Sequence, residues 1–373
     1  MTSGPGKRSR RRGTVRADQE EGNVDLDGAP GAATRWRRDD PLAAWASPSP
    51  LRAEADAWVR TSLAAQGTQV RGPLRPHRLR FWSAVLTTET DRGRVWFKAT
   101  NPGQAFEPAL LAVLARLVPD DVVVPLAVDA ARGWALLPDG GATWRERGAG
   151  VDDWAALLAQ VAAVQQTLCG AGTDLAAAGL PRLLPEEGAA YVRDLVSTLA
   201  ALPPADPQHV DAPTARALHA AVPRLEDALA LLAATGVPPT LQPNDVSTGN
   251  AFAPRGPEGR ARLFDLGDAF WSHPFAVLQV PLRFATGAWP GPPAPDDPVA
   301  AWLRDAYLAA WSGDLRGVDA LRAVDAADRL ASLHRCESWR RLLRWVDAAA
   351  VPAPVPRLAT WLADALRVGP AGR

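Results

Sequence analysis

The order in which strand-forming and helix-forming patterns follow one another limits the fold of this chain more than any other sequence feature. Segments dense in β-branched and aromatic residues lie at 79–88, 94–100, 122–128 and 134–137. From residue 151 onward apolar residues recur mainly at helical spacing, and only 240–268 has the pattern of loops and short strands. Because strands and helices occupy separate parts of the chain, we predict an α+β fold.

A small first lobe is predicted at 41–138. A helix at 51–65 precedes a hairpin formed by the first two strand segments, and a helix at 108–117 begins at a proline, which is favoured in a first helical turn. The sequence Pro138-Asp139-Gly140-Gly141 follows the last strand and predicts a linker. We therefore expect a small antiparallel sheet and its helices to end there.

A larger and mostly helical lobe is predicted at 139–373. Its expected helices, which proline-rich connections interrupt, lie at 151–168, 186–201, 212–234, 298–312, 318–349 and 356–367. Residues 1–40 instead combine many Arg, Gly, Asp and Ala residues with few large apolar ones, which is the composition of a disordered basic tail.

Composition and charge argue against several classes of protein. The chain has 41 basic and 41 acidic residues, so its net charge does not favour nucleic acid as a partner. No run of about 18 apolar residues predicts a membrane span, and the basic cluster near the start lacks the apolar segment of a secretory signal. Two cysteines are too few for a disulfide framework. We expect a cytoplasmic protein with no nucleic-acid or membrane partner, and the sequence does not predict its oligomeric state.

Lysine is almost absent from the chain. Only Lys7 and Lys98 are lysines among the 41 basic residues, and Lys98 is the one outside the predicted tail. If arginine replaces lysine wherever either residue serves, Lys98 indicates a position that needs a compact ammonium group. The alternative is that Lys98 is a chance survivor on an exposed strand.

The most informative segment is 241–268. Asp245 and Asn250 are five positions apart, as are the catalytic-loop aspartate and the metal-binding asparagine of protein kinases. Asp265-Leu266-Gly267 follows and is similar to their metal-binding Asp-Phe-Gly. One carboxylate and one amide oxygen can hold Mg²⁺ when phosphate oxygens and water complete its shell. Alternatively, Asp245 and Asn250 cap a turn, and Asp268 either faces the same cleft or caps a helix.

These motifs resemble those of the aminoglycoside phosphotransferase family over residues 70–345. The matching segments are Trp96-Phe97-Lys98, Phe106-Glu107 before a leucine-rich helix, Trp134-Ala135-Leu136-Leu137 before Asp139-Gly140-Gly141, the loop around Asp245, and Phe264-Asp265-Leu266-Gly267-Asp268-Ala269 with Ser272-His273-Pro274-Phe275 behind it. The resemblance implies a protein-kinase-like fold of two lobes, with ATP or GTP bound in the cleft between them.

The resemblance also implies a role for each site residue. Lys98 would hold the α- and β-phosphates, and Glu107 would orient Lys98. Asp245 would take the proton of a hydroxyl on a small-molecule acceptor, while Asn250 and Asp265 would bind Mg²⁺. Glu107 has a simpler interpretation as well, because a negative charge is favourable at the start of any helix.

Two departures from the family pattern leave a second function open. Pro243 stands where the family usually has a histidine that organises the loop, and proline offers no hydrogen-bond donor. Residues 70–85 contain only Gly72, so no glycine-rich loop over the phosphates is visible. The favoured function is an ATP- and Mg²⁺-dependent small-molecule kinase. The alternative is a pseudokinase, which binds a nucleotide or small ligand with little or no phosphoryl transfer.

Overall fold

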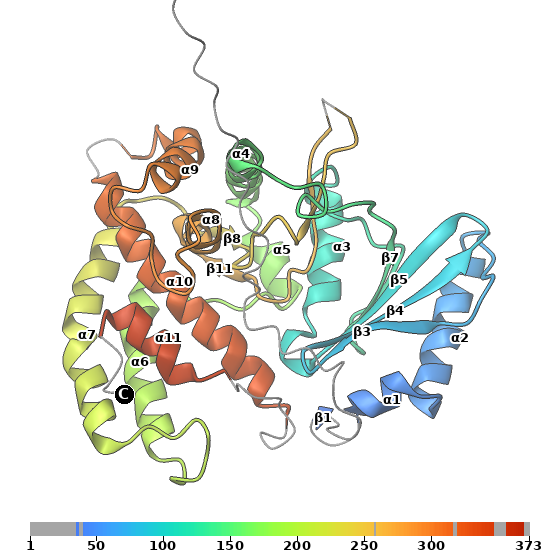
Figure 1. Ribbon diagram of the computed structural model, residues 1–373, viewed down its shortest axis with the longest axis horizontal. Coiled ribbons are helices and arrows are strands. Elements are labelled where there is room, and N and C mark those ends of the chain that lie inside the picture. The colour runs from blue at the N-terminus through green and yellow to red at the C-terminus, as the bar shows by residue number, and fades with distance from the viewer. Residues whose placement is uncertain (1–34, 37–39, 257–258, 316–318, 347–355, 369–373) are drawn as a thin grey trace, which may run out of the picture.

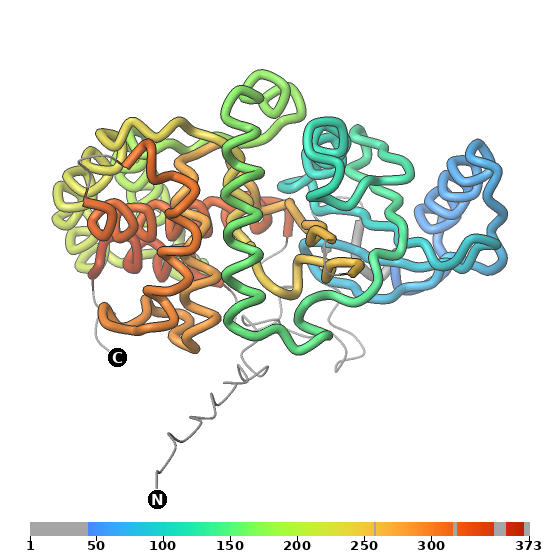
Figure 2. Tube along the Cα trace, turned by 90° about the horizontal axis from the view of Figure 1, so that it is seen from above, coloured from blue at the N-terminus to red at the C-terminus, as the bar shows by residue number. Residues whose placement is uncertain are grey.

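The computed structural model describes residues 35–36, 40–256, 259–315, 319–346 and 356–368. An antiparallel sheet and its helices form one lobe, and a larger helical lobe lies beside it (Figure 1). The view from above in Figure 2 separates the sheet lobe, in blue and cyan, from the yellow to red helices at the other end. The predicted α+β class is confirmed.

The five strands of the sheet are antiparallel and have the order β3-β4-β5-β7-β6. Their bounds are Arg75–Arg80 (β3), Ser83–Thr90 (β4), Gly93–Thr100 (β5), Ala127–Asp129 (β6) and Trp134–Pro138 (β7). Side chains alternate between the two faces of a strand, so neighbouring residues of β5 point to opposite sides. Phe97 packs in a core with residues of α1 (Leu42–Ala46) and α2 (Pro50–Ala64). Lys98 therefore faces the other side, toward α3 (Glu107–Leu117).

The second lobe is built from helices whose apolar faces share one core. They are α4 (Val151–Leu168), α5 (Gly172–Ala177), α6 (Pro185–Ala200), α7 (Ala212–Ala233), α8 (Gln279–Ala285), α9 (Pro298–Leu308), α10 (Ala320–Leu343) and α11 (Leu358–Leu366). Asp211, Asp297 and Asp319 cap α7, α9 and α10, because their carboxylates accept backbone N–H groups that have no partner inside the helix.

Short strands position the loops between the lobes. The strand β8 (Thr240–Gln242) pairs with β11 (Phe270–Ser272), and β9 (Ala251–Phe252) pairs with β10 (Arg262–Leu263), so the predicted pattern of loops and short strands at 240–268 is confirmed. The remaining elements are β1 (Arg35–Trp36), β2 (Asp40–Pro41) and the 3₁₀ turns η1 (Pro102–Gln104), η2 (Pro274–Leu278) and η3 (Ala309–Trp311).

Most predicted helices are confirmed to within a few residues, but two expectations for the sheet are wrong. Residues 79–88 are not one strand, because β3 ends at Arg80 and a two-residue turn, Phe81-Trp82, leads into β4. These aromatic residues carry none of the usual turn signals. Val122 forms only an isolated bridge with Leu263, and β6 begins five residues later. The short helices α5 and α8 were not predicted.

The predicted disordered tail falls almost entirely outside the described residues, of which it includes only Arg35, Trp36 and Asp40. No helix within the described ranges combines the length and the apolar character needed to cross a membrane.

Candidate active site

The predicted site residues come from four separate parts of the chain and meet between the lobes. Lys98 lies on β5, and Glu107 is the first residue of α3. Asp245 and Asn250 lie on the loop between β8 and β9, while Asp265 follows β10. A cavity of about 370 Å³ is lined by Asp245, Asn250 and Asp265, among other residues. The structure thus brings the distant motifs together at one cleft.

Lys98 forms two ion pairs at the edge of this cavity. Its Nζ lies 2.8 Å from the Glu107 carboxylate and 2.6 Å from Asp265 Oδ1. Glu107 also accepts a hydrogen bond of 3.0 Å from the backbone N–H of Leu266. The ammonium is therefore held by α3 on one side and by the segment after β10 on the other, and the expected pair between Lys98 and Glu107 is present.

Burial and charge act in opposite directions on this cluster. Burial alone would lower the pKa of Lys98, but the Asp265 and Glu107 carboxylates outweigh it and raise the pKa above its usual value. Burial raises the pKa of Glu107 despite the nearby Lys98. Burial would also raise the pKa of Asp265, but the positive charges of Lys98 and Arg78 outweigh burial and lower this pKa below its usual value. Lys98 stays protonated and Asp265 ionised near neutral pH.

Asp245 and Asn250 are directly connected. The Asn250 side-chain amide donates to the backbone oxygen of Asp245 at 3.0 Å and to its carboxylate Oδ2 at 2.9 Å. Burial raises the pKa of Asp245. The positive charge of Arg335 acts against this increase, and the negative charge of Asp268 adds to it. A carboxylate with a raised pKa is a better proton acceptor, so the environment of Asp245 suits a general base.

Asn250 and Asp265 have the donor atoms that a magnesium site requires. Asn250 uses its N–H group toward Asp245, and no described residue donates a hydrogen bond to its side-chain oxygen. Asp265 uses Oδ1 toward Lys98, and its other carboxylate oxygen has no hydrogen-bond partner in the described ranges. Two hard oxygens on one cavity fit a Mg²⁺ ion that keeps water and phosphate oxygens. Among the described residues no group of three or more His, Cys, Asp or Glu side chains could hold a metal by itself.

The backbone of the site is held in an unusual conformation. Asn244 and Asp265 have φ angles of 66° and 61°, in the left-handed region that residues other than glycine seldom adopt. Such a conformation persists only where the surrounding structure enforces it, and it is concentrated at functional sites.

Two buried side chains support the loop where Pro243 replaces the expected histidine. The Gln242 side-chain oxygen accepts from the backbone N–H of Asn244, and its amide lies 3.3 Å from His334 Nδ1. His334 Nε2 lies 3.0 Å from the backbone oxygen of Leu183. Because that oxygen only accepts, Nε2 carries the proton and Nδ1 accepts from Gln242. Gln242 on β8 and His334 on α10 therefore organise this loop from outside it.

Sequence reasoning missed Arg335, although it touches the predicted base. Its guanidinium lies 3.3 Å from Asp245 and 3.6 Å from Asp268. Gln104 donates to the other oxygen of Asp268 at 2.8 Å, so Asp268 faces the cleft and does not cap a helix. Gly267 permits this contact, because a Cβ there would lie 2.7 Å from the Gln104 side chain. Arg335 sits inside an amphipathic helix of an arginine-rich chain, where no local pattern distinguishes it.

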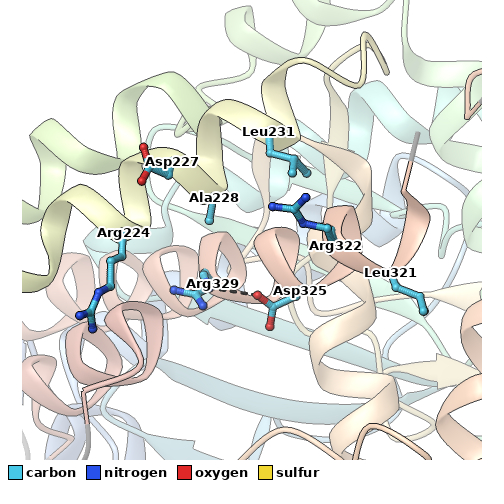
Figure 3. Close-up of a pocket in the computed structure, with 8 residues that line it drawn as sticks. All are labelled: Arg224, Asp227, Ala228, Leu231, Leu321, Arg322, Asp325 and Arg329. Carbon is cyan, nitrogen blue, oxygen red and sulfur yellow. Dashed lines mark hydrogen bonds and ion pairs between the residues drawn. The ribbon is translucent and has the colours of Figure 1, made fainter. Parts of the chain in front are cut away.

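A second hollow, of about 440 Å³, lies between α7 and α10 and is drawn in Figure 3. Its polar side chains include Arg224, Arg322 and the pair Arg329–Asp325, whose atoms are 3.2 Å apart. None of the predicted site residues lines it. The candidate site is therefore the smaller cavity between the lobes, where the predicted residues gather.

Comparison with solved structures identifies the fold. An ethanolamine kinase from Plasmodium vivax is similar over 79% of this chain and 80% of its own, with a TM-score of 0.54 and 11% sequence identity. A putative aminoglycoside phosphotransferase from Ralstonia eutropha covers 84% of this chain and 96% of its own, at 14% identity and a TM-score of 0.48. The first likeness shows that this chain has a two-lobed, kinase-like fold, as the resemblance of its motifs implied.

No protein-family model matches the sequence, and no curated protein does so either. The likeness therefore lies in the arrangement of elements and not in overall sequence. The function rests on the site itself.

Proposed function

We propose that this protein transfers the γ-phosphoryl group of ATP, or of GTP, to a hydroxyl group of a small molecule, with Mg²⁺ as the metal. The single observation that carries the proposal is the cluster at the cleft. A buried lysine with two carboxylate partners stands beside a connected aspartate and asparagine, within the kinase-like fold. The ethanolamine kinase from Plasmodium vivax, by its name, also acts on a small alcohol.

Each residue has a role that its surroundings support. Lys98 is held by Glu107 and directs a fixed positive charge toward the phosphates. The free oxygens of Asn250 and Asp265 would hold Mg²⁺, which neutralises charge on the phosphates when bound. Asp245, whose raised pKa suits proton acceptance, orients the acceptor hydroxyl.

The transfer step conserves atoms and charge. The acceptor oxygen forms a bond to the γ-phosphorus as the bond from that phosphorus to the bridging oxygen breaks. The hydroxyl proton passes to Asp245, and the nucleoside diphosphate, ADP or GDP, leaves with the bridging oxygen. This step needs positioning and charge neutralisation more than covalent help from the protein.

Two isosteric substitutions separate metal binding from proton transfer. Asp265→Asn should abolish the stabilisation that Mg-ATP gives the parent in a thermal-shift assay, because one metal ligand loses its charge. Asp245→Asn should keep that stabilisation and reduce turnover by about 10²- to 10⁴-fold, the usual contribution of a general base. Asp227→Asn is the matched control, since Asp227 is exposed on α7 and lines the separate hollow between α7 and α10.

Acceptor-dependent ADP release is the measurement for turnover, over a panel of small hydroxyl compounds. Equal turnover of the parent and Asp245→Asn on the best acceptor would refute the role of Asp245. Unchanged Mg-ATP stabilisation in Asp265→Asn would refute the metal assignment.

A nucleotide-binding protein without transfer activity is the second candidate. One observation favours it: the β3–β4 turn is only two residues long and carries Phe81 and Trp82. Such a turn has no glycine backbone to close over phosphates. A parent protein that is stabilised by Mg-ATP yet transfers phosphate to no member of the panel would favour this candidate.

A further inference from the structure

The cavity beside Asp245 is lined by two groups of aromatic rings. Trp82, from the β3–β4 turn, and Trp339, from α10, have ring centroids 6.0 Å apart. Other segments supply Trp289, which is stacked on Phe284 with ring centroids 4.9 Å apart, and Trp361 of α11, whose ring lies 5.9 Å from that of Trp289. All five rings are half-buried and line the cavity. They provide flat apolar surface next to the predicted base.

A buried ion-pair network fixes one of these walls. The Arg283 side chain on α8 is wholly buried and donates to the backbone oxygen of Pro290, next to Trp289. The same guanidinium lies 2.9 Å from Asp364, one turn along α11 from Trp361. The loop after α8 and the helix α11 are therefore connected through a single side chain, and the wall is built before any ligand arrives.

The carboxylates of the cavity already have cationic partners from the chain. Arg335 is paired with Asp245 and Asp268, and Lys98 is paired with Asp265. The Arg335 guanidinium also lies 5.9 Å from the Trp289 ring and 6.0 Å from the Trp361 ring. It therefore occupies the place where a cationic acceptor would find both carboxylates and aromatic faces. Three further arginines line the cavity, namely Arg78, Arg145 and Arg357.

We propose that this cavity binds an uncharged, hydroxylated ring compound as the acceptor, and that Arg335 determines this specificity. The proposal rests on the phosphotransferase function proposed above. The ring lies against the tryptophan walls, and its hydroxyl reaches Asp245. Amines are disfavoured, because an ammonium would meet Arg335, and each carboxylate among the described lining residues already has a cationic partner.

A matched pair of ligands tests the proposal on the parent protein. Phenyl β-D-glucopyranoside and its 6-amino-6-deoxy derivative share the ring and the 2-, 3- and 4-hydroxyls, and differ only at C6, where an amine that is protonated at pH 7 replaces the hydroxyl. Binding is measured by tryptophan fluorescence in the presence of Mg²⁺ and a non-hydrolysable ATP analogue. We expect the uncharged glycoside to bind at least about tenfold more tightly. Equal or tighter binding of the amine, or no binding of either compound, would overturn the proposal.

Variants of Arg335 assign the selectivity to its charge. Arg335→Gln should reduce the preference for the uncharged glycoside to less than about threefold, whereas Arg335→Lys, which keeps the charge, should retain most of it. Arg224→Gln, an exposed position outside this cavity, is the matched control and should change nothing. Circular dichroism and thermal unfolding verify that each variant is folded. An unchanged preference in a folded Arg335→Gln protein would overturn the role of Arg335.

Acceptor-dependent ADP release separates this inference from the proposed function. Selective binding of the uncharged glycoside without ADP release would refute the proposed phosphoryl transfer and support the proposed charge selectivity. Faster ADP release with the amine would support the transfer and overturn the selectivity.

Discussion

Replacement of Lys98 by methionine tests whether the central ion pairs support the fold as well as the chemistry. The side chain of Lys98 is 11% exposed and that of Glu107 only 2%, so the substitution leaves a buried carboxylate without its partner. Removal of one member of a buried pair typically costs about 3 to 5 kcal/mol. We expect the lower end of this range, because Asp265 is 31% exposed and water solvates part of its charge.

The loss should depend on pH in a defined direction. Burial already raises the pKa of Glu107, and Lys98 opposes that effect. Without Lys98 the pKa of Glu107 rises further above its value in the unfolded chain. As pH falls from 7.5 to 5.5, the folded variant then takes up a proton that the unfolded chain does not. The difference in unfolding free energy between parent and variant should therefore become smaller at pH 5.5.

Urea unfolding at the two pH values measures both effects. Arg94→Met on the same strand is the matched control, since the Arg94–Glu89 pair is exposed and should contribute much less. The double variant Lys98→Met/Glu107→Gln should recover part of the loss, because it removes the unpaired charge. A loss below about 1 kcal/mol at pH 7.5, or a loss that does not shrink at pH 5.5, would refute the reasoning.

Two further predictions concern the buried residues His334, His273 and Gln242. Burial lowers the pKa of His334 to about 4 and that of His273 to about 3, whereas both are near 6.5 when unfolded. The unfolded chain therefore takes up protons first as pH falls, and stability should decline between pH 6.5 and 4, by on the order of 3 kcal/mol for His334. Urea unfolding along this range checks it, and a flat profile would contradict it. Gln242→Leu leaves the Asn244 N–H and His334 Nδ1 without their partner, so we expect a loss of about 1 to 3 kcal/mol and reduced turnover. Unchanged melting temperature and ADP release would show that Gln242 does not organise the loop.

Several features were determined by the sequence alone, because each has a local signature. Helical periodicity located α4 and most of the later helices, since one apolar face must be buried whatever covers it. The rarity of lysine indicated Lys98, and the spacing of Asp245, Asn250 and Asp265 predicted a shared site. The roles of these residues in nucleotide, metal and proton chemistry stay predictions until the variants are measured.

Other features depend on which distant segments meet, and only the tertiary structure decided them. Asp245 and Arg335 are 90 positions apart, and periodicity shows that a helix face is buried without naming its partner. The same holds for the support of Asn244 by Gln242 and His334. Pro243 stands where a loop histidine was expected, and the buried His334 on α10 contacts Gln242 from outside the loop. The aromatic walls of the cavity beside Asp245 likewise combine a strand turn, a loop and three helices, which no local pattern relates. A local sequence pattern reflects how a segment forms its own backbone hydrogen bonds and which of its faces is apolar. The charge and shape of a cavity are instead set by contacts between distant segments.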